Sequence, residues 1–188
     1  NAEIKKKLAH YISTKPDRIA TIQNTSHGNS LIASGLTLSE KETIILCEDD
    51  YPAVTYPYLI QAHKKCTIIW TSFSKIRKNP YLLPELIATH RPRLIAISWV
   101  HYQTGYCIPI SELSKACQTY NCHLIVDGTQ AVGAIPINLT QTPVSALTFS
   151  CYKWLRCPPG LGYMMISPQL EDELTLQHAG VFSAQRPF

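Results

Sequence analysis

The segment Val126-Asp127-Gly128-Thr129-Gln130 joins an apolar run to polar side chains that could do chemistry. Asp127 follows the run His123–Val126, and Gln130 comes three residues later. In open α/β sheets, ligands bind outside the carboxyl ends of the strands, so we expect Asp127 to face a binding crevice. The alternative, which the residues alone leave open, is that Asp127 caps a following helix.

A lysine follows the next apolar run along the chain. Lys153 lies in Ser150-Cys151-Tyr152-Lys153-Trp154, just after Ala146–Phe149. A lysine in such surroundings either extends its amine to solvent or is held in a cleft with a lowered pKa. The second arrangement is the one that imine formation with an aldehyde requires.

Small polar residues precede a helix that we predict over Ser26–Gly35, with Ser26 as its cap. The stretch is Gln23-Asn24-Thr25-Ser26-His27-Gly28-Asn29. Free backbone N–H groups and the helix dipole make such a helix start an anion site, although an ordinary cap is the alternative. The sequence contains neither GxGxxG nor GxxxxGK[ST], so no dinucleotide or Walker-type nucleotide site is indicated.

The acidic trio Glu48-Asp49-Asp50 follows another apolar run and precedes Tyr51. Three adjacent carboxylates on a loop cannot all face one ion, so we expect no metal site. Tyr51, at the end of a strand, either stacks on a planar ligand or simply packs against the protein.

Seven apolar runs must position these residues, and we predict that each is a strand. They are Arg18–Gln23, Thr43–Cys47, Thr67–Trp70, Leu94–Trp99, His123–Val126, Ala146–Ser150 and Gly162–Ile166. Helices are predicted over Ala2–Ser13, Ser26–Gly35, Pro52–Lys64, Tyr81–His90, Ile110–Thr119 and Pro168–Leu176, and an exposed loop over Lys75–Pro84. The helix over Tyr81–His90 requires Pro84 to lie in its first turn.

This alternation predicts a three-layer α/β/α fold with a mainly parallel, seven-stranded sheet. Only the short stretch Cys151–Leu161 separates the sixth run from the seventh. Because that is too short for a helical crossover, we expect the last strand to be antiparallel.

Length and composition fit one globular domain. The chain has 188 residues, of which 45% are hydrophobic, and a formal charge of +4. It has no basic stripe interleaved with aromatics, no run long enough to span a bilayer and no signal-peptide pattern, so we expect neither a nucleic-acid nor a membrane partner.

The seven cysteines are odd in number and lack CxxC spacing, which favours free thiols and a cytoplasmic location. Only 16% of residues are charged, which indicates either a covered surface or one rich in uncharged polar residues.

Parallel strands bring their carboxyl ends to one edge of a sheet. An anion-binding helix start, a stacking aromatic, a buried carboxylate and a lysine would therefore meet there. That combination suits a flat, phosphorylated pyridine that carries an aldehyde.

On these residues the sequence resembles the fold-type I pyridoxal-phosphate (PLP) enzymes, and within them the class V aminotransferase group. This group includes cysteine desulfurases, kynureninases, cystine lyases and isopenicillin N epimerases. The resemblance covers nearly the whole chain. It rests on Asn24-Thr25-Ser26-His27-Gly28, Asp50-Tyr51-Pro52, Tyr102-Gln103-Thr104-Gly105, Asp127-x-x-Gln130, Ser150-Cys151-Tyr152-Lys153-Trp154 and Pro159-Gly160-Leu161-Gly162.

The resemblance implies a role for each matching residue. Lys153 would form the internal aldimine, a Schiff base with pyridoxal 5'-phosphate, and then move the Cα proton of the substrate. Asp127 would pair with the ring nitrogen, Gln130 with the phenolic oxygen, and Tyr51 would stack on the ring. The phosphate would be held by Thr25, Ser26, the His27 amide, Ser150 and Tyr152. Tyr51 and Tyr152 replace a common His, and Tyr102, also expected at the cofactor, stands where several relatives carry Asn.

The resemblance also implies the wider organisation. Residues 1–188 would be the PLP-binding large domain, without the family's N-terminal segment and C-terminal small domain, and would form a homodimer. The expected reaction is lyase-like or desulfurase-like elimination or cleavage at Cβ of a small-molecule amino-acid substrate. The alternatives are a truncated or non-catalytic scaffold protein that retains the fold, and a nucleotide-binding α/β domain.

Overall fold

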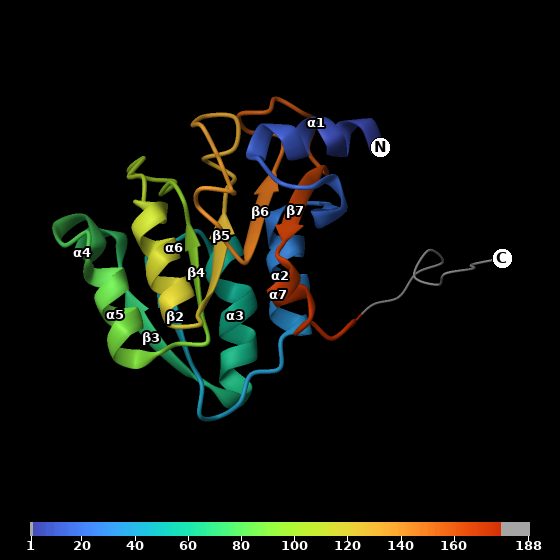
Figure 1. Cartoon of the computed structure of the whole chain (residues 1–188). Helices are drawn as coiled ribbons and strands as arrows, with labels where there is room; N and C mark the ends of the chain where they lie inside the picture. Colours follow the sequence, from blue (N-terminus) through green and yellow to red (C-terminus); the bar gives the residue numbers. More distant parts are fainter. Residues whose placement is uncertain (1, 178–188) are drawn as a thin grey trace.

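One seven-stranded sheet, in the order β1-β7-β6-β5-β4-β2-β3, runs through the molecule (Figure 1). The structure is a computed structural model that describes residues 2–177, without the side chains of residues 61–65. The strands are β1 (Ile19–Ile22), β2 (Thr43–Cys47), β3 (Thr67–Thr71), β4 (Leu94–Ser98), β5 (His123–Asp127), β6 (Ala146–Ser150) and β7 (Gly162–Ile166). All seven predicted strands are confirmed, with ends that differ from the prediction by at most one residue.

The predicted antiparallel last strand is also confirmed. Strands β3, β2, β4, β5 and β6 pair in parallel, whereas β7 runs antiparallel to β6 on one side and to β1 on the other. This tight packing requires glycine at position 162, because a Cβ there would lie 2.6 Å from the Phe149 carbonyl oxygen and 3.5 Å from the Asn24 Cα. The start of the helix that follows Asn24 is thereby held close to the end of β6.

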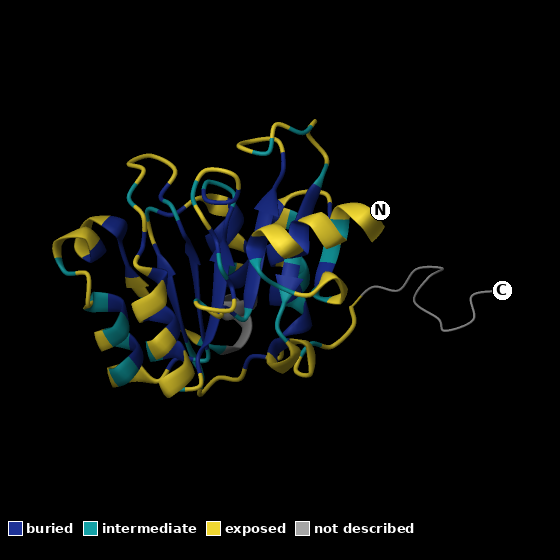
Figure 2. Ribbon diagram, turned by 45° about the horizontal axis from the view of Figure 1, so that its top comes forward, coloured by how far each residue is buried: buried dark blue, intermediate teal, exposed yellow. Residues whose placement is uncertain are grey.

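Helices cover both faces of the sheet, as the three-layer prediction requires. They are α1 (Ala2–Ile12), α2 (Thr25–Gly35), α3 (Pro52–Lys65), α4 (Phe73–Lys78), α5 (Leu82–His90), α6 (Ile110–Thr119) and α7 (Pro168–Glu171), with a 3-10 turn over Pro16–Arg18. Adjacent residues of β2 belong to opposite cores: Ile45 belongs to the core that includes residues of α1, α4, α5 and α6, whereas Ile44 belongs to the core that includes residues of α2, α3 and α7. Figure 2 shows the buried strands between helices whose outer sides are exposed.

Helices α2 and α3 are joined by a side chain that compensates for a proline. Pro57 lies inside α3 and has no N–H to donate to the Ala53 carbonyl. The Asn29 amide of α2 donates to that carbonyl instead, at 2.9 Å. The two helices that flank the carboxyl ends of the strands are therefore fixed to each other.

The predicted helix over Pro168–Leu176 is too long. Helix α7 ends at Glu171, although the Ser167 cap and Pro168 start it as expected. Beyond it, the Thr175 amide donates to the Gly35 carbonyl at 2.8 Å and the Glu173 carboxylate binds Arg93 and His123. These contacts with distant segments draw the chain out of a helical path.

The predicted loop over Lys75–Pro84 is wrong in part. Ser72 caps helix α4 by accepting from the Lys75 amide, and Phe73 and Ile76 bury one face of that helix. Pro84 is the third residue of α5, so the condition set for that helix is met. None of the helices among residues 2–177 combines the length and the apolar character that crossing a bilayer requires.

Candidate active site

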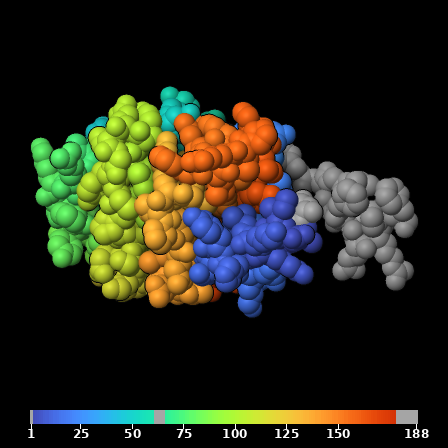
Figure 3. Space-filling model, turned by 90° about the horizontal axis from the view of Figure 1, so that it is seen from above, coloured from blue at the N-terminus to red at the C-terminus, as the bar shows by residue number. Residues whose placement is uncertain are grey.

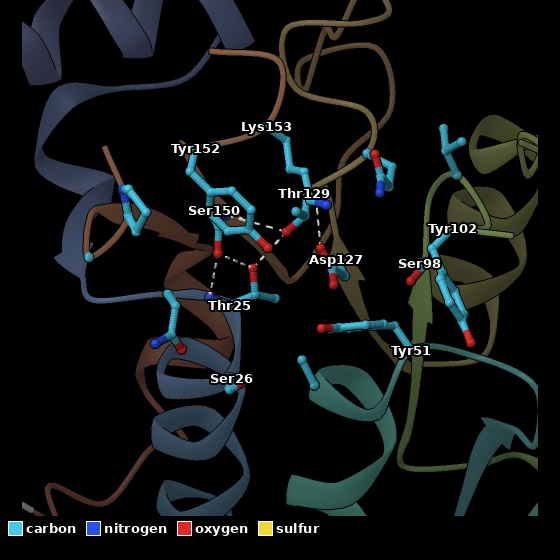
Figure 4. Close-up of a pocket in the computed structure, with 16 residues that line it drawn as sticks. Thr25, Ser26, Tyr51, Ser98, Tyr102, Asp127, Thr129, Ser150, Tyr152 and Lys153 are labelled. Carbon is cyan, nitrogen blue, oxygen red and sulfur yellow. Dashed lines mark hydrogen bonds between the residues drawn. The ribbon is translucent and has the colours of Figure 1, made fainter. Parts of the chain in front are cut away.

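A cavity of about 350 Å³ opens at the carboxyl edge of the parallel strands (Figure 4). Figure 3 looks down on this edge, where the segments that follow β4, β5 and β6 meet. The cavity is lined by nine of the ten predicted site residues: Thr25, Ser26, Tyr51, Tyr102, Asp127, Gln130, Ser150, Tyr152 and Lys153. Seven other residues line the cavity. Asn24, Thr129, Pro159 and Gly160 stand in the motifs quoted above but were given no role, and sequence reasoning missed Ala53, Ser98 and Val100.

His27 is the predicted residue that the structure does not bring to this cavity. Its amide donates to the Asn24 side chain at 2.9 Å, and its ring accepts from the Gln23 amide at 3.3 Å. Helix α2 thus begins at Thr25 and is capped by Asn24, not by Ser26. Because the cap occupies the His27 amide, that group cannot also bind a phosphate without leaving Asn24. The Asn three residues before His27 is the signal that the prediction overlooked.

Three hydroxyl groups meet at the start of α2. The Thr25 amide donates to Ser150 Oγ at 3.0 Å, and Thr25 Oγ1 lies 3.0 Å from Ser150 Oγ and 2.6 Å from Thr129 Oγ1. The Ser150 amide also donates to Thr129 Oγ1, at 3.3 Å. Side chains from α2, β6 and the turn after β5 therefore form one polar cluster at a helix N-terminus, which is a favourable place for an anion.

Asp127 lies at the floor of the cavity as the last residue of β5, and it is only 5% exposed. Oδ1 accepts from the Thr129 amide at 2.7 Å. The residues that follow form turns, so the helix-cap alternative is wrong. Burial raises the pKa of Asp127 to about 7, and the negative charge of Asp50 adds to this rise. In the described part of the chain, no basic side chain forms an ion pair with Asp127.

A second buried carboxylate fixes the neighbouring wall. Asp50 accepts from the Ser98 amide at 2.8 Å, the Ser98 hydroxyl at 2.6 Å and the Tyr51 amide at 2.6 Å. Ser98 ends β4 directly beside Asp127, so Asp50 orders both the floor and the start of α3. Asp49 instead accepts from the Phe73 amide, so these two carboxylates of the acidic trio have separate partners.

Aromatic side chains form the rim of the cavity. The Tyr51 ring is 46% exposed and meets the Tyr102 ring edge-on, with 5.2 Å between centroids. Tyr102 packs edge-on against His101, which stacks on Phe73 at 4.2 Å. Tyr51 is thus supported from behind while its ring reaches into the cavity (Figure 4).

Lys153 reaches the cavity from the loop that follows β6. Its Nζ lies 5.2 Å from the centre of the Tyr152 ring, and its side chain lines the same cavity as Asp127 (Figure 4). The Trp154 indole donates to Gln130 Oε1 at 3.0 Å. This contact holds the loop against the turn after β5 and leaves the Gln130 NH₂ group as the donor that can bind a ligand.

The donor set fits one kind of ligand. A helix start with hydroxyls suits a phosphate, an aromatic ring suits a planar group, and a primary amine suits an aldehyde. The buried Asp127 carboxylate, without a basic partner among the described residues, suits a protonated ring nitrogen. Fold and site together define an α/β domain with a site for a phosphorylated pyridine aldehyde.

The chain belongs to the class V aminotransferase family, because residues 1–186 match the profile described as Aminotransferase class-V. Members of this family use pyridoxal phosphate. The chain is 29% identical to the uncharacterized aminotransferase YcbU of Bacillus subtilis, over 96% of this chain and 48% of that protein. It is 27% identical to the isopenicillin N epimerase of Streptomyces clavuligerus, over 92% and 44%. The chain therefore spans about half the length of the curated relatives it matches.

Solved structures show the same fold. The protein C-DES, in a form with glycine covalently linked to its PLP cofactor, superimposes with a TM-score of 0.86 at 21% identity. The match covers 95% of this chain and 48% of that one. In a second solved structure, C-DES is described as a cystine C–S lyase.

Proposed function

We propose that this chain is the PLP-binding large domain of an enzyme that acts on an amino acid, with elimination or cleavage at Cβ as its reaction. The observation that carries the proposal is the buried Asp127 carboxylate, which has no basic partner in an ion pair among the described residues and lies in the same cavity as Lys153 and the start of α2. A carboxylate in that position favours a protonated pyridine nitrogen over a neutral one.

The phosphate group would bind at the start of α2. Thr25, Ser26 and Ser150 line this part of the cavity, and Tyr152 lies on its far side (Figure 4). Within the described structure, the Thr25 and His27 amides already have partners, so Ser26 is the residue of the first helical turn whose amide is free to donate. Thr129 Oγ1 would hold Thr25 and Ser150 in place.

The ring would lie between Asp127 and Tyr51. Asp127 would accept from the ring nitrogen, and the Gln130 NH₂ group would donate to the phenolic oxygen. Tyr51 would stack on one face of the ring. Its amide is held by Asp50 and its ring rests on Tyr102, so its position is set before the cofactor binds.

Lys153 would supply the reactive amine of this chain. Its amine would attach the cofactor aldehyde covalently, and after the substrate displaces it, the free amine would take the proton from the substrate Cα. Bound pyridoxal phosphate supplies an electron sink for the charge that develops at Cα. Loss of a group from Cβ is favoured by the likeness to a cystine C–S lyase.

Three wider statements belong to the same proposal. The substrate is a small-molecule amino acid, and the working form is a homodimer, which the family resemblance suggests. A cytoplasmic location is supported by the cysteines, all seven of which are free.

Covalent attachment tests the proposal directly. We expect the purified chain to develop a visible absorption band with pyridoxal phosphate and, after borohydride reduction and peptide mapping, to carry the reduced adduct on Lys153. Lys153→Ala should abolish this adduct and leave the circular dichroism spectrum unchanged, whereas Lys115→Ala on the exposed side of α6 should label as the wild type does.

An adduct in Lys153→Ala at the wild-type level would disprove the assigned site. A folded wild-type chain that binds no cofactor would instead favour the scaffold alternative.

A further inference from the structure

Two thiols enclose the loop that carries Lys153. Cys151 follows β6 directly and Cys157 lies six residues later. The Cys157 amide donates to the Cys151 carbonyl at 3.1 Å, and the Cys157 thiol, which donates to the Leu155 carbonyl at 3.6 Å, lies close enough to Cys151 to raise its pKa. This backbone bond links the two residues directly, as a disulfide requires, since its α-carbons must lie within about 4.4–6.8 Å.

The two thiols differ in access. Cys151 is 1% exposed and belongs to the core, whereas Cys157 is partly exposed on the edge of that core. Cys157 is thus placed as the thiol that an external reagent meets first.

We propose that Cys151 and Cys157 form a reversible disulfide that locks the loop carrying Lys153, and that the oxidant is a low-molecular-weight disulfide such as glutathione disulfide. This inference goes beyond the proposed function and does not require a bound cofactor.

The reaction proceeds in two exchanges. The Cys157 thiolate attacks one sulfur of the reagent and releases one small thiol, which leaves a mixed disulfide on Cys157. The Cys151 thiolate then attacks the Cys157 sulfur, forms the internal disulfide and releases the second small thiol. The protein loses two electrons and two protons, and the reagent gains both as two thiols.

The second exchange is assisted by the first. Burial and the neighbouring Cys157 thiol raise the pKa of Cys151 to about 11. Once Cys157 is in a mixed disulfide, it no longer ionises and no longer raises the pKa of Cys151. Only burial then opposes ionisation of Cys151, beside a sulfur already activated for attack.

A second thiol pair provides a control within the same chain. The Cys122 amide donates to the Cys117 carbonyl at 2.9 Å, and Cys122 lies close enough to Cys117 to raise its pKa. Both residues are buried, at 3% and 6% exposed. Since the backbone link is alike and the access differs, the Cys117–Cys122 pair should react much more slowly.

The test treats the cofactor-free chain with glutathione disulfide, blocks remaining thiols and maps the peptides. Chymotrypsin cleaves after Tyr152 and Tyr120, so the members of each pair fall in separate peptides that a disulfide would keep joined. We expect joined Cys151 and Cys157 peptides that dithiothreitol separates, and unlinked Cys117 and Cys122 peptides. Cys157→Ser should remove the link without disturbing the core, and Cys122→Ser should leave it intact.

The rate of tryptic cleavage tests whether the disulfide restrains the loop. Trypsin cleaves after Lys153 and Arg156, and we expect these cuts in the native protein to be at least about tenfold slower after oxidation. A glutathione adduct on Cys157 without an internal link would overturn the proposal, as would linked Cys117 and Cys122 peptides alone. A Cys151–Cys157 link that leaves the cleavage rate unchanged would overturn the locking.

Discussion

The two edges of the sheet differ in how their charged side chains are paired. At the amino edge of the parallel strands, Arg93 forms ion pairs with Glu173 and, at 3.4 Å, with Glu42. His123 Nε2 lies 3.0 Å from Glu173 as well. At the carboxyl edge, Asp50 and Asp127 are both buried, and neither has a basic partner in an ion pair within the described residues.

The pKa values of the two edges reflect this difference. Burial alone would raise the pKa of Glu173, but the hydrogen bond and charge of His123, together with Arg93, lower it below its usual value. At Asp127, burial prevails and the pKa rises. A paired charge stabilises the fold, whereas an unpaired buried charge opposes folding and is retained where a ligand supplies the partner. The contrast supports the proposal that the carboxyl edge holds the functional site, whereas the charges at the amino edge stabilise the fold.

The pH dependence of stability should show the largest difference. The pKa of Asp127 is about 7 in the folded chain and about 3.9 when unfolded, so the folded state binds more protons between these values and loses stability as the pH rises through them. From about pH 4.5 to 7.5, Asp127→Asn should therefore gain roughly 3 kcal/mol relative to the wild type. Urea unfolding of the cofactor-free wild type and variant at both pH values measures this difference. If the stabilities of the two proteins change equally with pH, Asp127 does not distinguish the carboxyl edge from the amino edge.

The same substitution should have the opposite effect on the cofactor. Without the carboxylate, a protonated ring nitrogen loses a charge-assisted bond, so Asp127→Asn should weaken pyridoxal phosphate binding about 100-fold. An absorbance titration gives the dissociation constant. The exposed Asp17→Asn should bind as the wild type does, and equal affinities for all three proteins would remove Asp127 from the site.

A substitution at Thr129 should weaken binding of the phosphate group without affecting binding of the ring, and its effect should be smaller. Thr129→Val removes the hydroxyl shared by Thr25 and Ser150 but retains the amide that binds Asp127. We expect about tenfold weaker binding of pyridoxal phosphate and unchanged binding of pyridoxal, which has no phosphate. The exposed Thr21→Val serves as the control. An equal loss for both ligands would place Thr129 at the ring rather than at the phosphate.

At the amino edge the expected effect is on folding alone. Glu173→Gln leaves Arg93 and His123 without their shared anion and should lower the free energy of unfolding by about 1 kcal/mol at neutral pH. Its contribution disappears as the pH falls through the lowered pKa of Glu173, because the carboxylate is then protonated. Glu3→Gln, in an exposed pair with Lys7, should change little. A loss of cofactor affinity in Glu173→Gln would contradict the separation of the two edges.

Local patterns in the sequence determined the strands and where the reactive side chains stand. The run from His123 onward has to be buried on both faces, and that places Asp127 at a strand end whatever surrounds it. The same reasoning placed Lys153 after β6 and Tyr51 after β2. Nine predicted side chains therefore line one cavity, because parallel strands end at a common edge.

Tertiary structure decided what depends on partners distant in sequence. Helix α7 ends early because Glu173 and Thr175 bind Arg93, just before β4, and residues of β5 and α2, and no local pattern encodes that competition. Thr129 and Ser98 entered the site through hydrogen bonds to residues 104 and 48 positions away. Burial is a property of the packed molecule, so only the fold could show that Asp127 lacks a basic partner among the described residues while Glu173 has two.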